Sequence, residues 1–304
     1  VGGRLFHQGM SRIIALDAWN GAVLWQTEIP DLRRVNIPRD ASNWCADDRH
    51  LYVAINDRVW VIDQATGERL ETLTLPVKEL DSHEWGYIAA GGGMLFGSAV
   101  KRSSPYTAFW SKAQWYDGRN NDATAKVCSD ALFGVNRKSG ALAWIYENGV
   151  ILNTTICGSA GTLFFVESRY PALKTLKTGR IGDARLWEQQ YVVALDSESG
   201  AHKWEKSIDT ANGDVVFYMQ ATPKDLVLTA SGGDKYTINN LSPENGAARW
   251  TAEHKWTANN HGGHMQHPVV YDDVIYLEPY GYRLSDGKRL EKRMGGREGC
   301  HTYV

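Results

Sequence analysis

The chain contains 304 residues, with 33 basic and 35 acidic side chains and a formal charge of -2 at pH 7. Because this balance leaves no basic surface for a phosphate backbone, we expect no nucleic-acid partner. Hydrophobic residues make up 43% of the chain and aromatic residues 11%, which argues against a disordered protein. No apolar run reaches the roughly 20 residues that a membrane-spanning helix needs, so we expect a globular chain without a transmembrane segment.

The chain ends and the cysteines give weaker constraints. The sequence starts at Val1 without a methionine or a secretory signal pattern. We interpret it as a processed product or a fragment, truncated at both ends and attached to further domains. The cysteines lack CxxC spacing, which argues against zinc knuckles and thioredoxin-type motifs. We expect buried free thiols, with one disulfide as the alternative, at Cys45, Cys128, Cys157 and Cys300.

In chain order, one short pattern occurs six times: an apolar strand, a turn that ends in Gly, and an amphipathic strand. An Asp or Asn before the Gly suits a hairpin turn, because its side chain can accept backbone hydrogen bonds and Gly supplies a positive φ. In four copies Trp follows the Gly by four residues, where a flat ring can wedge between neighbouring sheets. The turn glycines are Gly21, Gly67, Gly140, Gly200, Gly246 and Gly287, and the tryptophans are Trp25, Trp144, Trp204 and Trp250.

The spacing of these turns predicts the fold. Three intervals between the glycines, of 46, 46 and 41 residues, match one four-stranded propeller blade, and the two longer ones require insertions at about 101–130 and 168–189. The second copy predicts four short strands at 43–46, 51–55, 59–63 and 69–73. No stretch has a helical period, which disfavours parallel α/β folds. We predict one all-β domain over 1–304, a β-propeller of four-stranded antiparallel blades.

The number of blades is left open by the chain ends. Residues 3–8 predict a second strand, and residues 300–304 predict an inner strand. The last strand either completes the first blade of a six-bladed ring or begins another blade. We favour the second interpretation, with six visible blades plus one extra inner strand in a seven- or eight-bladed ring.

The repeats ALDAWNGAVLW, VIDQATGERL, VALDSESGAHKW and NNLSPENGAARW resemble the tryptophan-docking repeats of the quinoprotein propeller superfamily over essentially the whole chain. That superfamily contains dehydrogenases that use pyrroloquinoline quinone and also PQQ-like repeat proteins without a cofactor, such as an outer-membrane assembly scaffold. The dehydrogenases carry an adjacent Cys-Cys pair and a calcium-bound catalytic carboxylate that have no match here. The resemblance therefore implies no bound PQQ or other cofactor, and a periplasmic or otherwise extracytoplasmic location.

Sorting the connections by face predicts where ligands bind. The connections at 47–49, 158–161, 223–225 and 272–273 are tight and share one face with the Gly turns, which we interpret as structural. Both insertions and the long loops between blades share the other face. Long loops on a rigid scaffold commonly carry function. We therefore expect a protein or small-molecule ligand on the loop-rich face and at the mouth of its channel.

Three histidines on this face, His261, His264 and His267, have a spacing of three residues. Their imidazoles suit zinc or copper, with His301 or Cys300 as a further ligand from the next inner strand. The alternative is that His267 begins a strand and the other two face solvent.

Arginines are the second candidate for the channel mouth, because guanidinium groups bind carboxylates and phosphates in bidentate fashion. The alternative is solvated loop charge that pairs with neighbouring acidic residues. The full set of candidate ligand-binding residues is Arg33, Arg34, Arg39, His83, Glu84, Asn153, Arg169, Arg297, Cys300 and His301.

No catalytic set can be named from the sequence. We therefore predict a non-catalytic PQQ-like propeller that binds a ligand or a protein. The alternative is a metal- or quinone-dependent oxidoreductase, or a hydrolase that uses carboxylates, at the same channel mouth.

Overall fold

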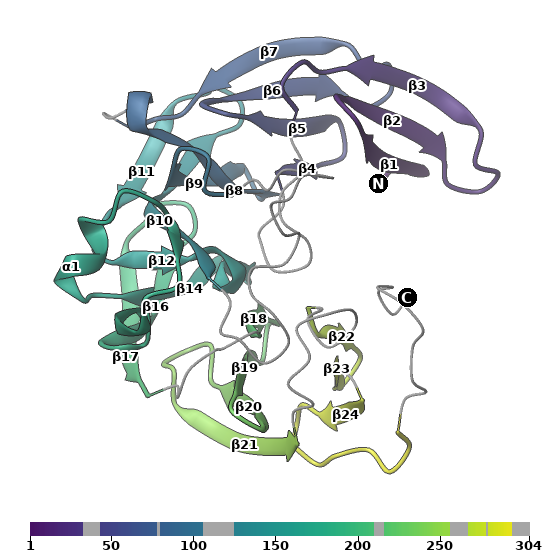
Figure 1. The fold of residues 1–304 in the computed structure, drawn as a ribbon. Helices are drawn as coiled ribbons and strands as arrows, with labels where there is room; N and C mark the ends of the chain where they lie inside the picture. Colours follow the sequence, from purple (N-terminus) through teal and green to yellow (C-terminus); the bar gives the residue numbers. More distant parts are fainter. Residues whose placement is uncertain are drawn as a thin grey trace.

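The computed structural model describes residues 1–32, 43–77, 80–105, 125–209, 216–255, 267–277 and 279–293. Within these ranges every strand pairing is antiparallel, and helical structure is confined to α1 (Pro171–Lys174) and the short 3-10 segments η1 (Leu80–Ser82), η2 (Asn153–Thr155) and η3 (Ala184–Trp187). The sheets follow one another in chain order around a common centre (Figure 1). The predicted all-β propeller of antiparallel blades is confirmed.

The first two repeats form separate sheets. The first holds β1 (Arg4–Gly9), β2 (Arg12–Asp17) and β3 (Val23–Glu28). The second holds β4 (Trp44–Ala46), β5 (His50–Ile55), β6 (Arg58–Asp63) and β7 (Arg69–Thr74). The strand ends of the second repeat lie within one residue of the predicted ones. Alternation of apolar residues and Asp- or Gly-containing turns therefore locates these strands closely.

The third and fourth repeats merge into one sheet of ten strands. The joining strand is β12, which pairs with β10 on one side and β14 on the other. The strands are β8 (His83–Gly91), β9 (Met94–Lys101), β10 (Lys126–Asn136), β11 (Leu142–Tyr146), β12 (Val150–Leu152), β13 (Cys157–Ser159), β14 (Thr162–Ser168), β15 (Arg180–Ile181), β16 (Gln190–Asp196) and β17 (His202–Ile208). The predicted insertion at 101–130 thus overlaps the start of β10, and the one at 168–189 holds α1, β15 and η3.

The last two repeats again form separate sheets. The fifth repeat has four strands: β18 (Phe217–Ala221), β19 (Leu226–Gly232), β20 (Lys235–Leu241) and β21 (Ala248–Lys255). The sixth has three in the described residues: β22 (Val269–Tyr271), β23 (Val274–Leu277) and β24 (Tyr280–Arg283). The three cysteines that the structure describes, Cys45, Cys128 and Cys157, are free thiols.

Indole rings connect successive repeats. The Nε1 of Trp25, on the third strand of its sheet, donates to the carbonyl of Gln64 in the next sheet at 2.9 Å. The turn glycine of that next sheet lies under the ring, because a Cβ on Gly67 would sit 2.7 Å from Trp25. The same hydrogen bond recurs from Trp144 to Ser197, from Trp204 to Pro243 and from Trp250 to Leu284.

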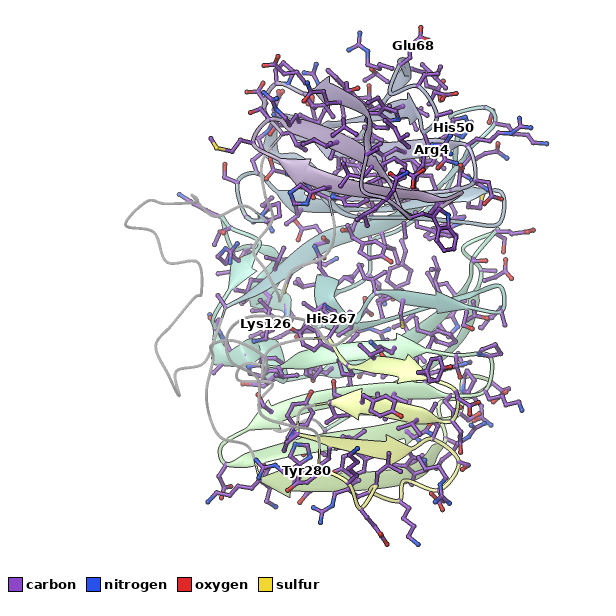
Figure 2. All side chains as sticks on the ribbon, turned by 90° about the vertical axis from the view of Figure 1, so that its right-hand side faces the viewer. Arg4, His50, Glu68, Lys126, His267 and Tyr280 are labelled. Carbon is purple, nitrogen blue, oxygen red and sulfur yellow. The ribbon has the colours of Figure 1, made fainter. Side chains whose placement is uncertain are left out.

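Apolar residues fill the space between successive sheets, so the core consists of several layers. Phe6 and Ile13 of the first sheet pack with Leu51 of the second, and Tyr52 of the second packs with Phe133 of the third. Each sheet is therefore stabilised by its neighbours. Viewed from the side, the ring has two faces, with His50 toward one and Lys126 toward the other (Figure 2).

Candidate functional site

The predicted site residues divide into those that the structure describes and those that it does not. His83, Glu84, Asn153, Arg169 and His267 are described. The others lie outside the described residues, so the predicted arginine cluster and most of the histidine cluster stay predictions: Arg33, Arg34, Arg39, His261, His264, Arg297, Cys300 and His301.

His83 lies on the loop-rich face, at the start of β8, in a cluster of charged groups. Its Nε2 is 2.9 Å from a carboxylate oxygen of Asp130, and its Nδ1 is 2.8 Å from the Ser82 hydroxyl. The Lys101 ammonium is 2.8 Å from the same carboxylate. Burial by itself would raise the pKa of Asp130, but the bonds from His83 and Lys101 hold it below its usual value. The carboxylate is therefore ionised and already neutralised by its neighbours.

A cavity of about 380 Å³ opens beside this cluster. Its apolar wall comes from Val77, Ala99 and Ala131, and its polar wall from His83, Asp130, Glu147 and Lys174. The Lys174 ammonium donates to the Glu147 carbonyl at 2.5 Å. The short helix of the second insertion thus closes one side of a small polar cavity.

Glu84 and Asn153 are both buried, and each has its own partners. A carboxylate oxygen of Glu84 accepts a hydrogen bond of 2.6 Å from the Ser103 amide. The Asn153 carbonyl oxygen accepts one of 2.6 Å from the Ser129 hydroxyl, while its Nδ2 has no hydrogen-bond partner in the described part of the chain. These side chains hold strand ends and connections together.

Arg169 is bound by two carboxylates. Its Nε donates to buried Glu167 at 2.7 Å, and its two terminal nitrogens donate to Glu205 at 2.8 and 2.6 Å. The guanidinium also stacks over the Tyr191 ring at 4.1 Å. Hydrogen bonding from Arg169 lowers the pKa of the exposed Glu205 to about 2. Because its donors are used within the protein, Arg169 acts in this geometry as a link between strands.

His267 stacks on Tyr218 with ring centroids 3.8 Å apart. The imidazole is open to solvent, yet enough protein surrounds it that desolvation lowers its pKa to about 4. It is therefore neutral near pH 7, as a metal ligand must be. In the described residues no group of three or more His, Cys, Asp or Glu is arranged to hold a metal ion, and the zinc or copper site stays a prediction.

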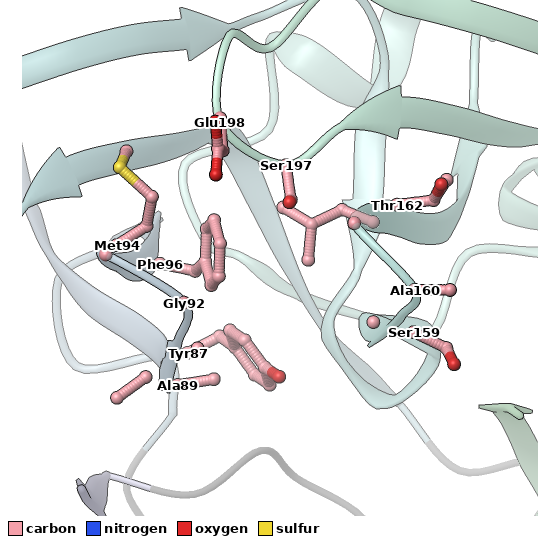
Figure 3. A pocket seen from close by; sticks show the side chains of 16 residues that line it. Tyr87, Ala89, Gly92, Met94, Phe96, Ser159, Ala160, Thr162, Ser197 and Glu198 are labelled. Atoms are coloured by element: carbon pink, nitrogen blue, oxygen red, sulfur yellow. The ribbon is translucent and has the colours of Figure 1, made fainter. Parts of the chain in front are cut away.

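The opposite face, formed by the tight turns, holds a cavity of about 410 Å³ between the third and fourth repeats. Tyr87, Met94, Phe96 and Leu163 supply its apolar side chains (Figure 3), and the turns at 91–93 and 158–161 form its rims. No hydrogen bond of the Tyr87 hydroxyl to another described residue is present. Glu198 contributes an exposed carboxylate at the edge.

A second turn-face cavity of about 560 Å³ adjoins the first, because Gly93 lines both. Its floor is organised by Asp47, which accepts a hydrogen bond of 2.9 Å from Tyr52 and pairs with Arg137. Arg49 and Lys138 are exposed at its rim and form no ion pair in the described residues. The two cavities together have an apolar part, a cationic end where Arg49 and Lys138 outnumber the exposed carboxylate of Asp48, and an anionic end at Glu198.

This face was predicted to be structural, and the sequence does contain a sign of the first cavity. The run Gly91-Gly92-Gly93 and the turn Gly158-Ser159-Ala160-Gly161 belong to neighbouring blades. Small residues in both turns leave space between them, because only the short side chains of Ser159 and Ala160 extend from these turns. Periodicity identifies each turn but does not reveal that the two turns face each other.

Comparisons with known proteins agree with the fold. No family model and no curated protein matches the chain. Among solved structures, BamB from Moraxella catarrhalis matches at 14% identity and a TM-score of 0.50, over 93% of this chain and 68% of that one. The Dos1 propeller matches at 10% identity and a TM-score of 0.56, over 98% of this chain and 68% of that one. The chain shares the β-propeller fold of these structures.

A third similar structure shows how far that likeness extends. The quinohemoprotein alcohol dehydrogenase ADHIIG from Pseudomonas putida HK5 matches at 12% identity and a TM-score of 0.55, over 93% of this chain. The propeller spans only 50% of that enzyme's length. At these identities the likeness concerns the fold alone. No helix in the described ranges is long and apolar enough to cross a membrane.

Proposed function

We propose that this propeller is a non-catalytic scaffold whose turn face binds an extended polypeptide segment of a partner protein. One observation supports it above all: the two adjoining cavities that share Gly93 run across the turns of three successive blades. Pockets with an apolar floor and a few well-placed polar groups are typical of binding sites. A strand-like segment can place alternate side chains into such a row of pockets.

Charge complementarity specifies the segment. An apolar side chain suits the cavity lined by Tyr87 and Phe96, an acidic residue suits the end with Arg49 and Lys138, and a basic residue suits the end with Glu198. The Tyr87 hydroxyl, which forms no hydrogen bond to another described residue, can donate to a backbone carbonyl of the segment. In the described part of the loop-rich face, Asp130 and Arg169 are already bound by neighbouring side chains.

The test uses two synthetic ten-residue peptides, one with Lys, Phe and Asp in the order that matches the cavities and one with the two charges exchanged. We expect the matching peptide to bind more tightly in fluorescence anisotropy, with an affinity that falls as salt rises. The double variant Arg49→Glu/Lys138→Glu should weaken binding at least about tenfold, the effect of 1.4 kcal/mol. Lys206→Glu, at an exposed lysine of β17, is the matched control. Equal binding of the two peptides, or an equal effect of the control, contradicts the proposal.

A hydrolase site on the loop-rich face is the second candidate function. The observation that favours it is the series of the Ser82 hydroxyl, the His83 imidazole and the Asp130 carboxylate, with spacings of 2.8 and 2.9 Å. In such a series the Ser82 oxygen can attack the acyl carbon of an ester while His83 takes the hydroxyl proton. His83 can then donate that proton to the alcohol that leaves. Covalent labelling of Ser82 by a fluorophosphonate, lost in His83→Ala, would support this function over the scaffold.

The extracytoplasmic location is also a proposal. It rests on the resemblance of the repeats to the quinoprotein superfamily. Fractionation of cells that express the full open reading frame tests it, with the cytoplasmic fraction as the contradicting outcome.

A further inference from the structure

The first sheet exposes a leucine whose equivalents in the next four repeats are buried. Leu5 of β1 lies opposite Leu16, directly before the Asp of the turn. The leucines at the same register position of the second to fifth repeats are Leu51, Leu95, Leu163 and Leu226. Leu5 is 57% exposed, whereas these four are exposed by 3% or less.

The buried leucines show which side of a sheet this position faces. Leu51 packs in one cluster with Phe6 of the first sheet, and Leu95 packs with Tyr52 of the second. Leu163 likewise packs with Phe96 of the third repeat. The position therefore faces the preceding blade. Leu5 faces the side of the first sheet that has no other sheet against it in Figure 1.

The turn of the first sheet lacks the contact that the later turns have. A Cβ on Gly67, Gly200, Gly246 or Gly287 would meet the Trp ring of the preceding repeat within 2.7 Å, and one on Gly140 would meet Leu73 at 3.2 Å. At Gly21, with φ of +74°, no atom of the described residues lies within 4 Å of that place.

The first sheet also contains an equivalent of the backbone carbonyl that accepts the indole hydrogen bond in the later turns. In the four tryptophan contacts the indole N–H donates to the carbonyl three residues before the turn glycine: Gln64, Ser197, Pro243 or Leu284. The residue three before Gly21 is Ala18. We propose that Leu5, Ala18 and Gly21 form a docking seat for the outer strand of a further blade of the same repeat, with an indole four residues after its turn glycine.

A second copy of this chain does not supply that strand. The four tryptophans at this position, Trp25, Trp144, Trp204 and Trp250, are each bound to the next repeat of their own chain. The sixth repeat carries Glu291 at the corresponding place. The occupant is therefore a blade from outside the described residues, in agreement with a ring of seven or eight blades.

The main test adds such a blade to the chain. In this fusion a copy of residues 162–221 stands directly before Val1. Leu5 then follows the copied segment at the same distance at which Leu226 follows it in the fifth repeat. The copy of Trp204 in the added segment can reach the seat. In the fused protein we expect Leu5→Ala to lower the midpoint of thermal unfolding by about 4 °C or more, as for a buried leucine. In the 304-residue chain the same change should leave the midpoint unchanged.

Leu70→Ala is the matched control, because Leu70 is also half exposed but lies on an outer strand; we expect no shift in either protein. The proposal is overturned if Leu5→Ala is neutral in a fused protein that unfolds cooperatively.

A second measurement does not depend on folding of the added blade. The synthetic peptide of residues 198–208 is titrated into the 304-residue chain carrying ¹³C-labelled leucine methyl groups. An indole over the seat should move the Leu5 methyl resonances, and the Trp204→Ala peptide should not. Resonances that move equally with both peptides, or with protein concentration alone, would assign the surface to another occupant and overturn the proposal.

Discussion

Asp47 organises the turn at the cationic end of the turn-face cavities. One of its oxygens accepts hydrogen bonds from the amides of Arg49 and His50 at 2.8 and 2.7 Å, and the other from the Tyr52 hydroxyl at 2.9 Å. Burial alone would raise its pKa, but these bonds and Arg137 lower it from 3.8 to about 2. One carboxylate therefore fixes the turn, the floor of the cavity and the link between the second and third repeats.

This shift predicts a pH-dependent loss of stability. Because the folded pKa lies below the unfolded one, the stabilisation is complete above about pH 4 and is lost as pH falls toward 2. We expect Asp47→Asn to reduce the free energy of unfolding by about 2 kcal/mol at pH 7 and much less at pH 2. Urea denaturation across this range measures the difference. Asn at exposed Asp48 should have no effect, and a pH-independent effect at Asp47 would contradict the assignment.

The sequence predicts the face on which a site residue lies, but not its binding partner, because the partners are far apart in the chain. His83 can be assigned to the loop-rich face from the order of turns, but its partner Asp130 lies 47 residues away. Nothing in the sequence shows that Arg169 binds Glu205, 36 residues further along. A charged residue looks the same in a sequence whether it binds a ligand or a neighbouring strand, so local patterns identify the face but not the role.

At the scale of the elements, the turn glycine and the tryptophan form one device that acts between repeats. A Cβ on Gly200 would lie 2.5 Å from the Trp144 ring, although φ there, +68°, is close to that at Gly21. In the four later turns that meet a tryptophan ring, glycine is thus required twice, once for the backbone conformation and once for contact with the ring.

Substitution at two equivalent turns separates these requirements. We expect Gly21→Ala to lower the free energy of unfolding by about 1 kcal/mol, the cost of a left-handed conformation. Gly200→Ala should lower it by about 3 kcal/mol, because it also displaces the Trp144 ring. Chemical denaturation of both variants measures the difference, and near-UV circular dichroism should change only for Gly200→Ala. Equal losses would show that the ring does not depend on the turn.

The strands of the second repeat are predictable because each depends on alternation and on turn residues within its own sequence. The bridging strand β12 is not, because three apolar residues after Gly149 have no periodicity of their own. Their strand character comes from pairing with β10 and β14, where Ile151 lies opposite Ser129 and Glu167. Joining of the third and fourth repeats is thus a tertiary effect that a repeat pattern does not encode.

At the scale of the whole molecule, stability should be unequal around the ring. Each repeat is stabilised by contacts with its neighbours, as in other repeat proteins. The ten-stranded sheet is covered by the second repeat on one side and the fifth on the other, and β12 adds a hydrogen-bonded link within it. The first sheet packs against the second alone in the described residues, and only Phe6 of its inward strand β1 is buried.

Hydrogen exchange should therefore follow this order. We expect the amides of β1, β2 and β3 to exchange at least about tenfold faster than those of β14 and β16, because opening the first sheet breaks one interface and opening the central sheet breaks two. Exchange measured by mass spectrometry resolves these segments, with the exposed outer strands β7 and β17 as an internal comparison. If the added blade of residues 162–221 covers the seat at Gly21, exchange in β1 should slow toward the rate of β5, while exchange in β14 should stay unchanged. Equal protection of all sheets in the unextended chain would mean that the ring unfolds as one unit, and that its stability does not depend on the number of neighbours.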